Sequence, residues 1–315
     1  MSWKNLSPII LFTYNRPFHT TRTVESLAKN RFADKSELII YSDGPADSSV
    51  RTQVEEVRTC LRGIRGFREI SIIERENNLG LADSVITGVT EVLNKHGRAI
   101  VIEDDLILSE NFLYFMNSAL AHYEKDKIVY SVTGYSYPIR IPGSYNYDVY
   151  PFYRCSSWGW ATWKNRWETV DWDVKDYDEL KNSRTKIGLF NRGGEDLFDM
   201  LSLQVNGDVD SWAIRWCYSH FKNNALCLYP TEAHARNAGF DGTGVHSHVT
   251  NKFDVDLQNT HSDEIRFCPP EEINDEIARR ILKFLRTRDA FFKIRSPRFI
   301  WESIQSRYLY CKEKE

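Results

Sequence analysis

The amino-acid sequence predicts an α/β fold, in which a mostly parallel β-sheet is flanked by helices. Short apolar runs alternate with segments of helical periodicity over residues 8–108, and this alternation is typical of parallel strands joined by helices. Of the 315 residues, 42% are hydrophobic and 27% are charged, which is ordinary for a chain with a substantial core. Polar residues follow the apolar runs, at the ends of the strands where such sheets bind ligands.

The pattern predicts four strands in this part of the chain and a helix after each of the first three. We expect strands over residues 8–14, 37–42, 69–73 and 99–108. Pro17 and Gly44 break the first two runs, and Gly97 is placed to end the third helix. A further helix over residues 112–120 and strands over 127–133, 152–157 and 225–229 are expected beyond them.

Three consecutive acids end the fourth apolar run. Glu103, Asp104 and Asp105 would repel one another, and burying them is costly unless a cation or hydrogen-bond donors face them. Mg²⁺ and Mn²⁺ bind one or two carboxylates together with substrate phosphates, so a metal-bound phosphate ester would explain the cluster. A solvated acidic loop is the alternative reading.

Polar residues at the other strand ends favour the ligand site over the solvated loop. Arg16, Asp43, Asn78 and Gly80 are expected at the same edge of the sheet as the acids. The chain has neither a G-x-G-x-x-G motif opening a helix nor a G-x-x-x-x-G-K-[ST] loop, so it lacks the usual backbone cradle for phosphates. A divalent metal, Mn²⁺ or Mg²⁺, is therefore the expected cofactor of a nucleotide site.

The second half of the chain is rich in aromatic residues and carries further candidate site residues. Trp158 and Trp160 flank a glycine and would form either a sugar-binding platform or part of the core. Asp210 precedes a helix and could cap it. Residues 230–248 form a polar, glycine-containing loop of the kind that closes over substrates, with Arg236 and Asn237 as candidate ligand-binding residues and His246 as a candidate metal ligand.

The charge and the apolar content of the chain indicate its cellular compartment and its partners. Residues 276–315 hold 11 Lys and Arg against 5 Asp and Glu, although the whole chain has a net charge of −3. This basic, aromatic end could contact anionic lipid or pack on the catalytic body. No apolar run reaches the roughly 18 residues of a membrane span, and six scattered cysteines fit a reducing compartment. We therefore expect a cytoplasmic protein, with a peripheral membrane contact as one option and nucleic acid not among its partners.

Taken together, the motifs resemble those of GT-A glycosyltransferases, which have a Rossmann-like nucleotide-sugar domain. Their order is similar to the N-acetylglucosaminyltransferase I type and to family-2-like enzymes of bacterial polysaccharide gene clusters. The resemblance covers roughly residues 7–250, and it predicts a catalytic domain over 1–250 followed by a basic, aromatic helical extension over 251–315. The matching segments are Thr13-Tyr14-Asn15-Arg16-Pro17, Ser42-Asp43-Gly44, Asn78-Leu79-Gly80, Glu103-Asp104-Asp105, Trp158-Gly159-Trp160 and Asp210-Ser211-Trp212.

The resemblance implies a role for several of these residues. Asp105 would bind the metal, while Glu103 and Asp104 would contact the ribose, the sugar or the metal's water. Asp43 would contact the base beside Arg16. Asp210 would be the general base of an inverting transfer from a nucleotide diphosphate sugar, with UDP favoured, to a glycan or lipid-linked glycan hydroxyl. The loop around Gly242 departs from the family pattern, so its donor contacts stay open.

Two other functions compete with this reading. A nucleotidyltransferase also uses carboxylate-bound metals on a related sheet, but it normally has a glycine-rich loop after the first strand, which residues 12–17 lack. A non-catalytic sugar-binding subunit of a polysaccharide assembly complex would need neither Asp105 nor Asp210.

Overall fold

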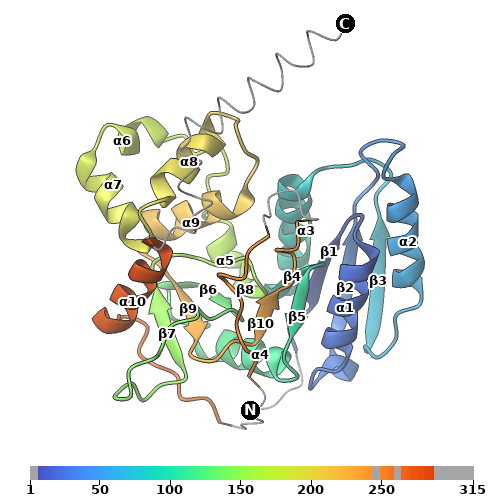
Figure 1. Ribbon diagram of the computed structural model, residues 1–315, viewed down its shortest axis with the longest axis horizontal. Helices are drawn as coiled ribbons and strands as arrows, with labels where there is room; N and C mark the ends of the chain where they lie inside the picture. The colour runs from blue at the N-terminus through green and yellow to red at the C-terminus, as the bar shows by residue number, and fades with distance from the viewer. Residues whose placement is uncertain (1–5, 243–248, 259–263, 287–315) are drawn as a thin grey trace, which may run out of the picture.

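The computed structural model describes residues 6–242, 249–258 and 264–286, and its centre is an eight-stranded sheet (Figure 1). The strands of this sheet are β1 (Ile9–Thr13), β2 (Glu37–Ser42), β3 (Glu69–Glu74), β4 (Arg98–Glu103), β6 (Val129–Thr133), β7 (Val149–Phe152), β8 (Trp160–Trp163) and β9 (Leu226–Pro230). Their order across the sheet is β3-β2-β1-β4-β8-β6-β9-β7. A separate two-stranded ribbon pairs β5 (Leu106–Leu108) antiparallel with β10 (Ala235–Asn237).

Helices connect these strands and cover both faces of the sheet (Figure 1). They are α1 (Pro17–Ala28), α2 (Arg51–Arg62), α3 (Leu81–His96), α4 (Phe112–His122), α5 (Lys164–Trp167), α6 (Tyr177–Lys181), α7 (Arg184–Phe190), α8 (Leu197–Val205), α9 (Trp212–Lys222) and α10 (Asp275–Arg286). Short 3₁₀ turns lie at η1 (Ala33–Lys35) and η2 (Asn191–Gly193).

The first strand shows how the apolar runs build two core layers. Successive side chains of a strand point to opposite faces. Ile9 and Leu11 therefore pack in one cluster with residues of α1, α2 and α4, while Ile10 and Phe12 pack in another with residues of α3 and α9. Because both faces are covered, all five residues of β1 are buried, which explains why the sequence shows a continuous apolar run here.

The parallel part of the sheet brings the predicted polar residues to one edge. β1 pairs in parallel with both β2 and β4, and β2 pairs in parallel with β3. The carboxyl ends of these four strands consequently lie at the same edge, where Arg16, Asp43, Asn78 and the acids follow them. The predicted fold class, a mostly parallel sheet flanked by helices, is confirmed.

The second half of the sheet is mixed, and here the sequence analysis was wrong in detail. β8 lies antiparallel between β4 and β6, whereas the sequence analysis expected a strand over residues 152–157 and none over 160–163. Trp160 faces the cluster of α3 and α9, and Trp163 faces that of α4. With bulky residues buried on both faces, a four-residue strand shows no alternation that could reveal it.

Tryptophan rings fasten α9 to the sheet. The ring centroids of Trp160 and Trp212 lie 5.1 Å apart in a stacked arrangement, and those of Trp167 and Trp216 lie 5.2 Å apart. All four side chains are buried. Aromatic pairs of this kind add about 0.5–1.5 kcal/mol each beyond their area burial, so they fix the position of α9.

The described part of the C-terminal extension packs on the rest of the molecule. Ile277 and Ile281 of α10 are buried in a cluster that also contains Tyr137 and Tyr229. Residues 287–315, which hold most of the basic and aromatic tail, lie outside the described residues. Among those that are described, no helix combines the length and the apolar composition needed to cross a bilayer.

Candidate active site

The last acid of the triplet sits where the β5–β10 ribbon meets the sheet. Asp105 lies between β4 and β5, and its backbone oxygen accepts a hydrogen bond from Ala238 N–H at 2.7 Å. Gly239 is so close that a methyl group at this position would overlap Oδ2 of Asp105. The segment after β10 therefore covers the carboxylate with backbone, and only glycine fits there.

One oxygen of the Asp105 carboxylate is paired, and the other is not. Oδ2 lies 3.0 Å from Nη1 of Arg16, while Oδ1 is buried with no hydrogen-bond partner among the described residues. Burial raises the pKa of Asp105, and the Arg16 guanidinium opposes that rise. An unpaired carboxylate oxygen of this kind can still coordinate a cation or accept a hydrogen bond.

The other two acids differ from Asp105 in their contacts. Asp104 is turned toward the start of α1, where its Oδ2 accepts weak hydrogen bonds from Tyr14 N–H at 3.3 Å and the Thr20 hydroxyl at 3.5 Å. Burial and the charge of Asp105 raise the pKa of Asp104 to about 7. Burial, Asp105 and Asp104 likewise raise the pKa of Glu103 to about 8. A bound cation would favour the ionised forms of all three carboxyls.

Two residues that the sequence analysis missed, His19 and Asp241, form a cluster with Arg16. Asp241 lies 3.7 Å from Nη2 of Arg16 and 3.0 Å from Nε2 of His19. His19 is in the first turn of α1, two residues after the Pro17 that marks the helix start, and this placement was the available signal. Nothing local in the sequence pairs it with an aspartate more than 200 residues away.

At the ends of β2 and β3, the predicted residues bond to one another. Both carboxylate oxygens of Asp43 accept the Leu79 N–H at 3.1 Å, and Oδ2 also accepts the Gly80 N–H at 3.1 Å. Asn78 Nδ2 donates to the Gly44 carbonyl at 2.9 Å. The two loops form one unit in which Asp43 is 5% exposed and accepts hydrogen bonds from backbone amides. A hydrogen bond that a nucleobase donates to Asp43 would have to compete with these amides.

The predicted residues of the late loop lie on the ribbon. Arg236 and Asn237 belong to β10 and pair with Ile107 and Leu106, and Asn237 Oδ1 accepts the Gly239 N–H at 2.6 Å. Asn237 therefore shapes the backbone turn over Asp105. His246 lies outside the described residues. Within the described part of the chain, no group of three or more His, Cys, Asp or Glu side chains could hold a metal by itself.

The two tryptophans that flank Gly159 have different environments. Trp160 is fully buried, so its ring packs the core, the structural role that the sequence left open for it. Trp158 is half-buried and makes edge-to-face contacts with Phe240 at 5.5 Å and Phe253 at 5.6 Å between centroids. Trp158 thus contacts the segments that follow β10.

Asp210 lies at the start of α9, and its carboxylate is accessible. Its side chain is 64% exposed and lies 3.1 Å from Nη2 of Arg215. Ser211, rather than Asp210, caps the helix, because its hydroxyl accepts the Ile214 N–H at 3.4 Å. Trp212 stacks on Trp160, which pairs with Val101 two residues before Glu103. This chain of contacts holds the start of α9 near the carboxyl end of β4.

The mostly parallel sheet flanked by helices and the match to a family model identify the chain as a GT-A glycosyltransferase. Residues 9–184, more than half of the chain, match the model of glycosyl transferase family 2, and the chain belongs to this family. The match ends before Asp210 and before the β10 segment. The family-2 part of the predicted resemblance is thereby confirmed, whereas the likeness to the N-acetylglucosaminyltransferase I type stays a resemblance.

Solved structures of similar proteins are distant in sequence, and no curated protein sequence matches. Residues 1–349 of S. aureus TarS are 12% identical over 73% of this chain and 60% of that chain, with a TM-score of 0.40. The mannosyltransferase PcManGT from Pyrobaculum calidifontis, solved in complex with GDP-Man and Mn²⁺, is 12% identical over 70% of each chain, with a TM-score of 0.41. Mouse xyloside xylosyltransferase 1 is 10% identical over 70% of this chain and 82% of that chain, with a TM-score of 0.34. Our family assignment rests on the family match.

Proposed function

We propose that this glycosyltransferase is metal-dependent and inverting, and that it moves a sugar from a nucleoside diphosphate sugar to a hydroxyl of a glycan. A UDP-sugar is the favoured donor, ahead of GDP- and dTDP-sugars. The observation that carries the proposal is Asp105, a carboxylate at the carboxyl end of β4 whose buried Oδ1 is unpaired among the described residues. Such an oxygen suits a hard divalent ion.

The residues present fit Mn²⁺ or Mg²⁺ if the donor supplies the remaining ligands. Asp105 offers Oδ1, and Glu103 and Asp104 would add negative charge beside it once a bound cation favours their ionised forms. His246 remains a proposed second ligand. These ions are commonly bound by one or two carboxylates plus substrate phosphates and water, so a three-residue protein cluster is not required. When bound, the ion supplies positive charge that stabilises the departing diphosphate.

Arg16 would support the same charge. Its guanidinium already lies between Asp105 and Asp241, at the end of β1. A planar cation in this place can form charge-assisted hydrogen bonds with phosphate oxygens. We therefore propose that Arg16 orients the diphosphate of the donor. We also propose that the unit of Asp43, Asn78 and Gly80 forms the wall of the site beside the nucleobase.

Asp210 is the proposed general base. Its carboxylate is exposed, so an acceptor hydroxyl can reach it, and Arg215 holds it from one side. Asp210 would take the proton of the acceptor hydroxyl while that oxygen attacks the anomeric carbon from the face opposite the leaving group. One base and one displacement invert the configuration of that carbon.

The composition of the C-terminal residues bears on the acceptor and the setting. We propose a glycan or lipid-linked glycan of bacterial surface polysaccharide synthesis, made in the cytoplasm at the inner membrane face. The support is the basic and aromatic composition of residues 287–315, which lie outside the described residues.

A donor panel tests this function. The full chain is incubated with UDP-, GDP- and dTDP-sugars and Mn²⁺, and release of nucleoside diphosphate is followed with and without EDTA. We expect release from one nucleotide class only, and none in EDTA. Release of pyrophosphate from a nucleoside triphosphate and a sugar phosphate would instead identify a nucleotidyltransferase. No release from any donor, together with no nucleotide binding, would support the non-catalytic alternative.

A further inference from the structure

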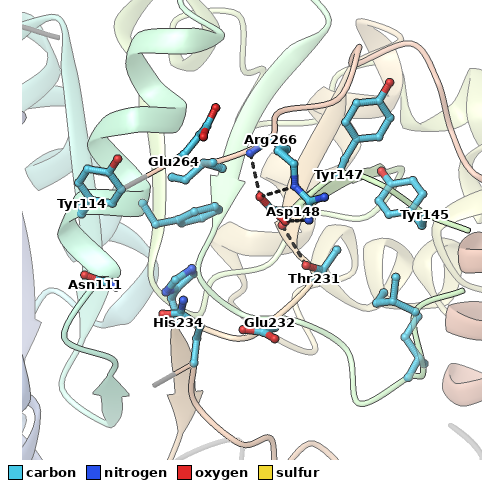
Figure 2. Close-up of a pocket in the computed structure, with 15 residues that line it drawn as sticks. Asn111, Tyr114, Tyr145, Tyr147, Asp148, Thr231, Glu232, His234, Glu264 and Arg266 are labelled. Carbon is cyan, nitrogen blue, oxygen red and sulfur yellow. Dashed lines mark hydrogen bonds and ion pairs between the residues drawn. The ribbon is translucent and has the colours of Figure 1, made fainter. Parts of the chain in front are cut away.

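A second candidate site is a pocket of about 680 Å³, whose lining residues are drawn in Figure 2. It is bounded by the start of α4, the loop before β7, the segment after β9 and residues 264–266. α4 packs on the same face of the sheet as α1 and α2, whereas α9, which Asp210 precedes, packs on the other. Its described lining contains none of Arg16, Asp105 and Asp210.

The β5–β10 ribbon separates this pocket from the acids. At the pocket end, Ser109 Oγ and His234 Nδ1 form a hydrogen bond of 3.0 Å. At the other end, Ala238 N–H donates to the Asp105 carbonyl. The three paired residues between them span about 10 Å at roughly 3.3 Å per residue. A ligand in the pocket would thus touch the same ribbon as the donor site without occupying it.

The walls combine aromatic rings with hydrogen-bonding groups. Tyr145 and Tyr147 meet edge to face, with centroids 5.6 Å apart, and Tyr114 lines the opposite part of the pocket (Figure 2). The Tyr145 hydroxyl donates a hydrogen bond to the Val149 carbonyl, and this bond fixes the ring. Rigid rings of this kind cover apolar C–H surfaces of a ligand and keep a polar edge at its rim.

The charged groups disfavour an anionic ligand. Arg266 is the one Lys or Arg in the described lining, and Asp148 neutralises it through Nη2 at 2.6 Å and Nε at 3.3 Å. His234 is neutral, because burial lowers its pKa to about 3. Glu232 adds an exposed carboxylate with no hydrogen-bond partner among the described residues. Unpaired acceptors of this kind bind hydroxyl groups well and phosphates poorly.

We propose that this pocket is a second carbohydrate site, which binds a neutral di- or trisaccharide through Tyr147 and Glu232 while the donor site is free or occupied. Its volume is in the range that encloses small ligands. The tyrosine rings pack against sugar C–H faces, and Glu232 accepts hydrogen bonds from sugar hydroxyls. The site would anchor a glycan at the far end of the ribbon from Asp105. It is argued from the pocket alone and does not require the transfer chemistry proposed above.

Saturation-transfer NMR on the full chain tests the inference, with maltotriose, N,N′-diacetylchitobiose and mannobiose as probes. We expect at least one probe to bind at millimolar concentration. Glu232→Gln and Tyr147→Ala should each weaken its binding at least about tenfold, the loss expected for a central contact. Glu25→Gln, the same change on the exposed face of α1, should leave binding unchanged. Circular dichroism checks the folding of Tyr147→Ala, and Glu232 is exposed enough for its variant to fold in any case.

Adding UDP with Mn²⁺ separates the two sites. The probe should remain bound, because the donor residues and the pocket residues differ. The inference is overturned if no probe binds, if binding survives both pocket variants, or if UDP with Mn²⁺ displaces the probe. Failure of UDP itself to bind would count against the proposed function and leave this inference standing.

Discussion

Arg16 Nη1 lies 3.0 Å from Asp105 Oδ2, and the two side chains are only 14% and 15% exposed. A fixed positive charge thus partly offsets the cost of burying three neighbouring carboxyls at the end of β4. Because the second Asp105 oxygen has no partner among the described residues, the offset is incomplete. This incomplete pairing makes a bound cation the simplest completion of the site.

Removing the Arg16 charge should lower the stability of the protein, because the carboxyls at the end of β4 lose the charge that partly offsets their burial. We expect Arg16→Gln to lower the free energy of unfolding in EDTA by about 1–3 kcal/mol, because a buried carboxylate loses its charged partner. Added Mn²⁺ should restore part of the loss. Arg62→Gln breaks an ion pair with Glu74 in which Arg62 is 55% exposed, and should cost less than about 1 kcal/mol. Urea unfolding measures both, and equal losses would contradict the burial argument.

The raised pKa values of Glu103 and Asp104 predict a pH dependence of stability. Below about pH 3 both groups are protonated in the folded and unfolded states. As the pH rises toward the folded pKa values of about 7 and 8, the folded protein keeps protons that the unfolded chain has released. The contribution of these groups to the free energy of unfolding therefore falls between pH 4 and pH 8. Urea unfolding in EDTA at pH 5 and pH 8 should show a smaller decrease for Glu103→Gln than for the unchanged protein, and an identical decrease would refute the assignment.

The turn over Asp105 should tolerate no side chain at residue 239. A methyl group there would overlap Asp105 Oδ2, so Gly239→Ala must move either the loop or the carboxylate. A displacement of about 1 Å can cost a hundredfold in rate, and we expect a loss of that order in kcat/KM. Gly188→Ala is the control, because Gly188 lies in α7 with open space around it and alanine favours a helix. Equal activity of the two variants would show that the close approach does not matter.

If Asp210 is the general base, its replacement should slow the chemical step without weakening nucleotide binding. Asp210→Asn should keep UDP binding within about twofold and reduce kcat by at least about a hundredfold, the usual loss when general-base catalysis is removed. Asp208→Asn, two residues earlier and also exposed, should retain full activity. Steady-state kinetics with the donor found in the panel provides the measurement, and full activity of Asp210→Asn would exclude this base.

The parallel half of the sheet and its edge could be predicted because their signals are local. Each apolar run of β1 to β4 is long enough to recognise, and the acids lie at the carboxyl end of β4. Parallel pairing then brings their ends together without further information. Arg16 and Asp105 are thus found in contact, as their positions after β1 and β4 imply.

The remaining features depend on contacts that no local pattern encodes. β8 is four residues long and buried on both faces, and the contacts of Asp241 with His19 and of Trp158 with Phe253 join distant segments. The second pocket likewise draws its lining from α4, two loops and residues 264–266. A sequence supplies the residues of such sites, whereas only the folded chain shows which of them meet.

Asp105 is proposed to hold a divalent ion on which nucleotide binding depends. Isothermal titration of UDP into the full chain with Mn²⁺ and with EDTA tests it directly, using Asp105→Asn and the surface control Asp173→Asn. We expect binding to the unchanged protein and to Asp173→Asn only with Mn²⁺, and at least about tenfold weaker binding to Asp105→Asn. Equal affinity of Asp105→Asn and the unchanged protein in Mn²⁺ would contradict the account.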